Sequence, residues 1–135
     1  MTRKQIRNTI AYWEEAAVHD YKTMEVLFET KRYSDSLFYA HIVLEKILKA
    51  LAVQQTGKHA EYTHNLMKLA EDAGLVLTKE EQDLLDIVND FNIRARYPDA
   101  KLQFYKKATK SYTAAYFIQV KEFYQKLCQK LKRQK

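Results

Sequence analysis

A chain of 135 residues with a net charge of +6 and 47% hydrophobic residues has the size and composition of one soluble domain with a core of its own. Its single cysteine excludes an internal disulfide, its charged N-terminal residues argue against a signal peptide, and no apolar run reaches the roughly 20 residues of a membrane span. We therefore expect one cytoplasmic domain over residues 1–135 that makes no contact with a membrane.

The first predicted helix covers residues 4–29. Its apolar residues recur at steps of three and four, the period of one helix face, and they are Ile6, Ile10, Trp13, Ala17, Met24 and Leu27. One position of this stripe is polar, because Asp20 stands between Ala17 and Met24 where an apolar residue is expected.

The second predicted helix covers residues 35–55, with Ser34 as its N-terminal cap. His41 occupies an apolar position of its stripe, and Glu45 and Lys49 follow at steps of four. Residues at this spacing are neighbours on a helix surface, so these three side chains should share one edge of the buried face.

The remaining segments read as two further helices and a connection. A short helix over residues 64–73 should end at Gly74, and Thr78 with Glu81 forms a capping box that starts a fourth helix. That helix must end before Pro98.

Residues 97–110 have no clean period, so we expect an irregular basic connection there, with apolar anchors at Leu102, Phe104 and Tyr105. The last helix should start near Ser111 or Tyr112. One-sided helices of this kind are stable only when packed together, so the predicted fold is all-α, an up-and-down antiparallel bundle of four to five helices.

Asp20 and His41 are candidate functional residues because burying a polar group is costly unless it is paired or hydrogen-bonded. One interpretation is an internal network in which the two side chains satisfy each other. The other is a polar cleft between the first two helices, in which an aspartate, a histidine and a nearby lysine serve binding or proton transfer.

A second candidate region follows the fourth helix. Residues 94–135 carry 12 basic and 2 acidic side chains, and Arg94 and Arg96 stand just before Tyr97. Arginine suits phosphate because its planar guanidinium matches the phosphate oxygens. The alternative is structural, with a pair of salt bridges, for example between Arg96 and Asp99, that hold the following loop. No HExxH motif and no cluster of cysteine and histidine occurs, so we expect no metal site and no cofactor.

Several segments, in the right order between about residues 12 and 100, resemble HEPN domains. They are Tyr12-Trp13, Ala16-Ala17-x-x-Asp20-Tyr21, Arg32-Tyr33, Phe38-x-x-His41-x-x-x-Glu45-Lys46-x-Leu48-Lys49, Thr63-His64-Asn65-Leu66 and Arg96-Tyr97-Pro98-Asp99. The resemblance implies a helical bundle, often a homodimer, that binds nucleotides or RNA. It also implies a small nucleotidyltransferase as partner, in a two-gene system of the toxin–antitoxin kind.

The catalytic members of that family carry an arginine followed four to six residues later by a histidine. This chain departs from the pattern, because its last histidine is His64. The catalytic residues therefore stay unknown, and the resemblance supports binding and partnership more than catalysis. The nucleotide- or RNA-binding candidates are Asp20, His41, Glu45, Lys49, Arg94, Arg96 and Tyr97. Two alternatives remain: a divergent ribonuclease that uses His41 or His64, and a non-catalytic module that docks on another protein.

Overall fold

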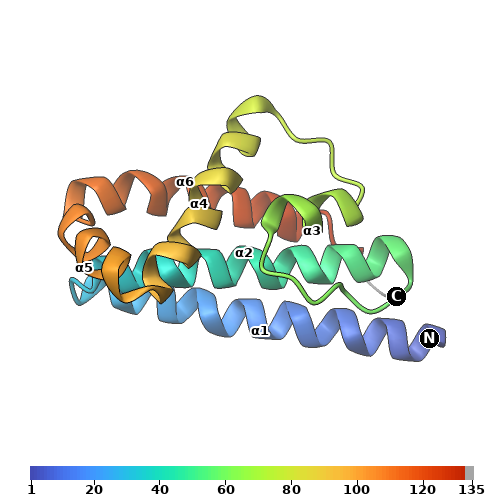
Figure 1. Ribbon diagram of the computed structural model, residues 1–135. Coiled ribbons are helices and arrows are strands. Elements are labelled where there is room, and N and C mark those ends of the chain that lie inside the picture. Colours follow the sequence, from blue (N-terminus) through green and yellow to red (C-terminus); the bar gives the residue numbers. More distant parts are fainter. Residues whose placement is uncertain (133–135) are drawn as a thin grey trace.

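The computed structural model describes residues 1–132, and within that range it contains six helices and no strand, which confirms the all-α prediction. The basic residues Arg133 and Lys135 lie outside the described residues. Helices α1 (Arg3–Glu29) and α2 (Tyr33–Thr56) form a long antiparallel pair, and α6 (Lys110–Gln129) packs along α2 (Figure 1). The short helix α3 (Leu66–Asp72) and the oblique helix α4 (Lys79–Arg96) cover α2 from the remaining side, and α5 (Pro98–Lys107) joins α4 to α6.

The central position of α2 explains why its polar residues are buried. This helix contacts every other helix of the bundle, and most of its residues from Leu37 to Val53 are buried. A helix that is covered on most sides leaves little solvent face to which a charged side chain can turn. The polar side chains of α2 must therefore find partners inside the fold or at its seams.

The helix ends agree with the predictions in part. The capping box of Thr78 and Glu81 is present, and α4 ends at Arg96, before Pro98, as expected. The prediction that Ser34 caps the second helix was wrong. Helix α2 begins at Tyr33, two residues before the predicted start at Asp35, and Arg32 precedes it without a side-chain cap. Helix α6 also begins slightly earlier than predicted, because the Thr109 side chain accepts from the backbone of Tyr112 and caps it.

The prediction of an irregular connection over residues 97–110 was wrong, because residues 98–107 form α5. Tyr97 is extended and Pro98 is the first helical residue, a position where the missing N–H of proline costs nothing. Of the three expected anchors only Phe104 is buried, whereas Leu102 and Tyr105 are 61% and 69% exposed. A helix held by a single large side chain shows no apolar period, which is why the pattern missed it.

The loop between α2 and α3 positions the candidate site. Gly57 ends α2 in the left-handed conformation, with φ +68°, and the chain then runs back along α2 before α3 begins (Figure 1). Asn65 caps α3, since its side chain accepts from the backbone N–H groups of Met67 and Lys68. This return places His64 beside the middle of α2. No helix within residues 1–132 has the length and apolar character to cross a membrane.

Candidate functional site

A polar stripe along α2 forms the centre of the candidate site. His41, Glu45 and Lys49 follow one another at steps of four residues, so they lie on one side of the helix, and the apolar Phe38 precedes them on the same side. His41, Glu45 and Lys49 are buried. The structure thus brings together three of the predicted binding residues, as the spacing indicated.

Glu45 is the hub of this stripe. One carboxylate oxygen, Oε2, accepts from Lys49 Nζ at 3.1 Å, and the other, Oε1, lies 2.7 Å from His64 Nδ1. The Lys49 ammonium also lies 5.0 Å from the centre of the Trp13 ring on α1. A buried carboxylate with a cation on one oxygen and an imidazole on the other is the compensation that burial of a charge requires.

Two histidines lie near Glu45, His41 on α2 and His64 in the following loop, and they have different roles. His41 is 1% exposed, and its Nε2 donates to the backbone carbonyl of His64 at 2.8 Å. Burial lowers the pKa of His41, so the ring is held in its neutral form. The His64 side chain is 49% exposed, and the bond from Nδ1 to Glu45 turns its Nε2 away from the carboxylate. Of these two imidazoles, His64 is therefore the one that a ligand can reach.

Asp20 does not belong to this network. Its carboxylate lies 2.8 Å from Lys46 Nζ and 3.2 Å from His19 Nδ1. The expected network in which Asp20 and His41 satisfy each other is not formed, because each binds a different partner. Asp20 instead links α1 to α2 through its ion pair with Lys46, so its role in this structure is to hold the two helices together.

Arg96 continues the polar stripe at the junction of α2, α4 and α5. Its Nε donates to Asn92 Oδ1 at 2.8 Å, and its guanidinium carbon lies 5.5 Å from the centre of the Phe38 ring. Arg96 borders a hollow of about 200 Å³ whose lining residues are Ser34, Asp35, Phe38, Ala95, Arg96, Lys101 and Phe104. Two cations and the Phe38 ring therefore share one concave site with the carboxylate of Asp35, which pairs with Arg32.

The structural alternative for the arginines holds in part, because Arg94 forms a salt bridge, but the example of Arg96 with Asp99 was wrong. Arg96 binds Asn92, and within the described part of the chain no ion pair joins it to Asp99. Arg94 pairs with Asp90 at 2.6 Å, one turn earlier on α4. Tyr97 is exposed and does not border the hollow.

Lys101 is the residue of this hollow that sequence reasoning missed. It lies on α5, in the segment that was expected to be irregular, so no spacing related it to Arg96. Pro98 is the sequence signal that could have revealed Lys101, because proline is common at the first position of a helix. A helix that starts at Pro98 places Lys101 in its first turn, close to Arg96.

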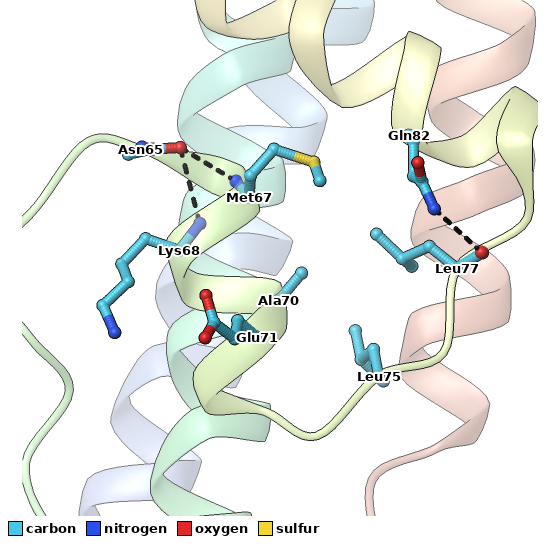
Figure 2. Close-up of a pocket in the computed structure, with 8 residues that line it drawn as sticks. All are labelled: Asn65, Met67, Lys68, Ala70, Glu71, Leu75, Leu77 and Gln82. Atoms are coloured by element: carbon cyan, nitrogen blue, oxygen red, sulfur yellow. Dashed lines mark hydrogen bonds between the residues drawn. The ribbon is translucent and has the colours of Figure 1, made fainter.

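A larger hollow of about 410 Å³ lies between α3 and the loop that leads to α4 (Figure 2). Three of its four polar side chains already have partners in the fold: Asn65 caps α3, Gln82 Nε2 donates to the carbonyl of Leu77, and Lys68 pairs with Asp72. Figure 2 shows Lys68 extending away from Leu75 and Leu77. The fourth polar residue, Glu71, is acidic and would repel a phosphate, so this hollow is the weaker candidate for a nucleotide despite its size.

The donor groups of the described residues do not form a metal site. Within residues 1–132 no group of three or more histidine, cysteine, aspartate or glutamate side chains is close enough to hold a metal ion. In the polar stripe, the single carboxylate of Glu45 is already shared between a lysine and a histidine.

Comparison with known proteins identifies one family. The family model described as HEPN domain matches residues 10–131, nearly the whole chain. No curated protein and no solved structure matches significantly. The matched range includes the polar stripe on α2, the loop that carries His64, and the hollow beside Arg96.

Proposed function

The chain belongs to the HEPN domain family, and we propose that it binds nucleotide or RNA at the hollow between α2, α4 and α5. The observation that carries this proposal is the convergence of Arg96 and Lys101 with the Phe38 ring in one concave site. Guanidinium and ammonium groups bind phosphate oxygens, and an aromatic ring offers a face on which a base can stack. The three groups together match the two chemical parts of a nucleotide.

The surroundings support the same ligand. The bond from Arg96 Nε to Asn92 fixes the guanidinium plane and leaves the two terminal amino groups to contact phosphate. Helix α5 carries two further lysines, Lys106 and Lys107, in its last turn. A strand of RNA that leaves the hollow along α5 would therefore stay in a basic environment.

In this proposal the buried residues that the sequence predicted as binding residues stabilise the site but do not contact the ligand. His41, Glu45 and Lys49 lie beneath the surface, so they hold the α2–α3 loop and the Trp13 ring in place. Asp20 fixes α1 on α2 through Lys46. Direct contact with the ligand is assigned to Arg96 and to Lys101. Arg94, which pairs with Asp90, and Tyr97 do not line the hollow and receive no contact in this proposal.

The double variant Arg96→Ala/Lys101→Ala is expected to bind single-stranded RNA at least tenfold more weakly, because each hydrogen bond to a charged group contributes roughly 1.5 kcal/mol or more. Fluorescence anisotropy of a labelled RNA at several salt concentrations measures the effect. The logarithm of the affinity should also depend less steeply on the logarithm of salt concentration, by about 0.7 for each phosphate that the variant no longer neutralises.

The matched control is Lys22→Ala/Lys79→Ala, which removes two positive charges from exposed positions elsewhere, on α1 and at the start of α4. This control should retain the affinity of the unaltered protein to within about twofold. If RNA binding weakened equally in both double variants, the affinity would depend only on net charge. The hollow would then not be the RNA-binding site.

The contact between Glu45 and His64 favours a second candidate function, cleavage of RNA. Glu45 orients the imidazole through Nδ1, which leaves Nε2 of this half-exposed ring as a proton acceptor. In such a reaction Nε2 takes the proton of a 2′-hydroxyl, the 2′-oxygen attacks the adjacent phosphorus, and the bond to the 5′-oxygen breaks. The 5′-oxygen leaves with a proton from the imidazolium or from water, and the products are a 2′,3′-cyclic phosphate and a 5′-hydroxyl.

Electrophoresis of the RNA recovered from the binding experiment tests this second function. Cleavage without added metal should occur and should fall at least a hundredfold in His64→Ala, since general base catalysis contributes about 10²–10⁴-fold. A His19→Ala variant, which removes an exposed histidine of α1, should cleave normally. Intact RNA after long incubation with the unaltered protein would leave binding as the only function.

Family membership also supports the proposal that the chain acts with a small nucleotidyltransferase as its partner and forms a homodimer. The exposed apolar side chains of Ile93, Tyr97, Leu102 and Tyr105 lie on α4, on α5 and between them, and they offer a surface for either contact. The same surface supports the alternative of a non-catalytic docking module. A neighbouring gene that encodes such an enzyme would favour the two-gene system. The mass of the purified chain in solution shows whether it is a monomer or a homodimer.

A further inference from the structure

A second concave site lies on the N-terminal half of α1, on residues that none of the functions above uses. Asn8, Thr9, Tyr12 and Trp13 lie close together along one side of the helix, and His59 from the α2–α3 loop completes the site. The hollow has a volume of about 350 Å³. That volume falls in the range of roughly 300–1,000 Å³ that is typical of pockets for small ligands.

Two aromatic rings shape this hollow. The ring centres of Tyr12 and Trp13 are 5.0 Å apart and their planes meet at 74°, so the rings form an edge-to-face corner. Tyr12 is 62% exposed, and its ring therefore contributes little to the core. An exposed tyrosine beside a half-buried tryptophan leaves aromatic surface available to a planar ligand.

The polar groups around the rings suit a base edge. Asn8 carries a carboxamide, which presents a donor and an acceptor side by side, the arrangement that pairs with the N6 and N7 atoms of adenine. The Thr9 hydroxyl donates to the backbone carbonyl of Gln5 at 2.8 Å, so its oxygen is left to act as an acceptor. None of the five lining residues is acidic, so nothing in the lining repels the phosphate of a nucleotide.

The tryptophan also links this hollow to the buried network of α2. The Lys49 ammonium lies 5.0 Å from the centre of the Trp13 ring, and Lys49 in turn binds Glu45. The contact fixes the indole from within the fold, and a ring that is already ordered loses little entropy when a base stacks on it.

We propose that the hollow formed by Asn8, Thr9, Tyr12, Trp13 and His59 is an adenine-binding subsite. The base stacks in the corner of Tyr12 and Trp13, and Asn8 contacts its N6 and N7 edge. The inference rests on the proposed function for its ligand class, a nucleotide or RNA. It adds a second place on the molecule where a base is held, separate from the phosphate-binding hollow beside Arg96.

Trp13 is the only tryptophan of the chain, so its emission reports directly on this subsite. Titration with adenosine monophosphate should quench the emission to a saturating level, and ribose 5-phosphate, which lacks a base, should leave it unchanged. Tyr12→Ala should weaken the adenosine monophosphate titration about tenfold, because stacking of a base on an aromatic side chain contributes about this much or more. Asn8→Ala should bring the affinity for adenosine monophosphate close to that for cytidine monophosphate.

Tyr105→Ala is the matched control, since it removes an equally exposed tyrosine from α5, and it should titrate like the unaltered protein. Tyr12 is exposed, so its replacement leaves the core intact, and an unchanged circular dichroism spectrum verifies this. Quenching that does not saturate, or a Tyr12→Ala variant that titrates normally, would overturn the subsite.

The double variant Arg96→Ala/Lys101→Ala separates this inference from the proposed function. It should keep the adenosine monophosphate titration of Trp13 and lose affinity for RNA. Normal quenching without salt-dependent RNA binding in the unaltered protein would reject the hollow beside Arg96 and leave the subsite standing. RNA binding that depends on Arg96 and Lys101, together with unresponsive Trp13 emission, would reject the subsite alone.

Discussion

Replacement of Glu45 by alanine is expected to lower the free energy of unfolding by about 3–5 kcal/mol, the cost of leaving a buried ion without its partner. The Lys49 ammonium would lose the carboxylate that lies 3.1 Å away, in a position with almost no access to solvent. His64 would lose the bond that holds its ring and the end of the loop. Urea denaturation followed by circular dichroism measures the change.

The chain offers a matched control for this prediction. Lys79 and Asp83 form an ion pair of the same i, i+4 spacing on α4, but both side chains are exposed. Asp83→Ala should therefore cost no more than about 0.5 kcal/mol. The double replacement Glu45→Leu/Lys49→Met should recover most of this stability, because it removes both buried charges together. Equal costs for Glu45→Ala and Asp83→Ala would show that burial does not govern the pair.

Phe104→Ala is expected to lower the free energy of unfolding by about 3–5 kcal/mol, the range for removal of a buried phenylalanine ring. Phe104 is the one buried residue of α5, and its ring centre lies 5.5 Å from that of Phe91 on α4. The replacement should also release α5, so that Lys101 no longer meets Arg96 in the hollow. We therefore expect weaker RNA binding in this variant even under conditions where the rest of the bundle remains folded.

Leu102→Ala and Tyr105→Ala provide the comparison on the same helix. Both side chains are exposed, so each replacement should change stability by no more than about 0.5 kcal/mol. A large cost at Leu102 or Tyr105 would mean that this exposed surface is covered in solution, for example by a second copy of the chain. Thermal denaturation at two protein concentrations would then distinguish that case, because the stability of a dimer depends on concentration.

The sequence predicts the bundle well because four of its helices carry long apolar stripes. The stripe of α1 and the capping box of α4 mark where those elements lie, to within a residue or two. Helix α5 has only one buried large side chain, so periodicity has nothing to detect there. The start of α2 was also missed, since Arg32 precedes it without a side-chain cap and the usual sequence signal is absent.

The buried polar residues of α2 were predictable as a group but not in their contacts, and Lys101 of the hollow was not predicted at all. The polar residues His41, Glu45 and Lys49 fall on an apolar face, which predicts burial, and the structure buries all three. Their partners depend on the path of the α2–α3 loop, which no local pattern encodes, so the bond between Glu45 and His64 was not foreseen. The same limit applies to Asp20, whose partner Lys46 lies on the next helix.

The uneven distribution of charge along α4 has a consequence for how a ligand arrives. This helix begins with Glu80 and Glu81 and ends with Arg94 and Arg96, and the basic helix α5 follows. An electric dipole of this kind turns the molecule while a polyanion is still several ångströms away, so the encounter starts with the basic end facing it. Salt should therefore slow the formation of the complex far more than it hastens the breakdown of the complex.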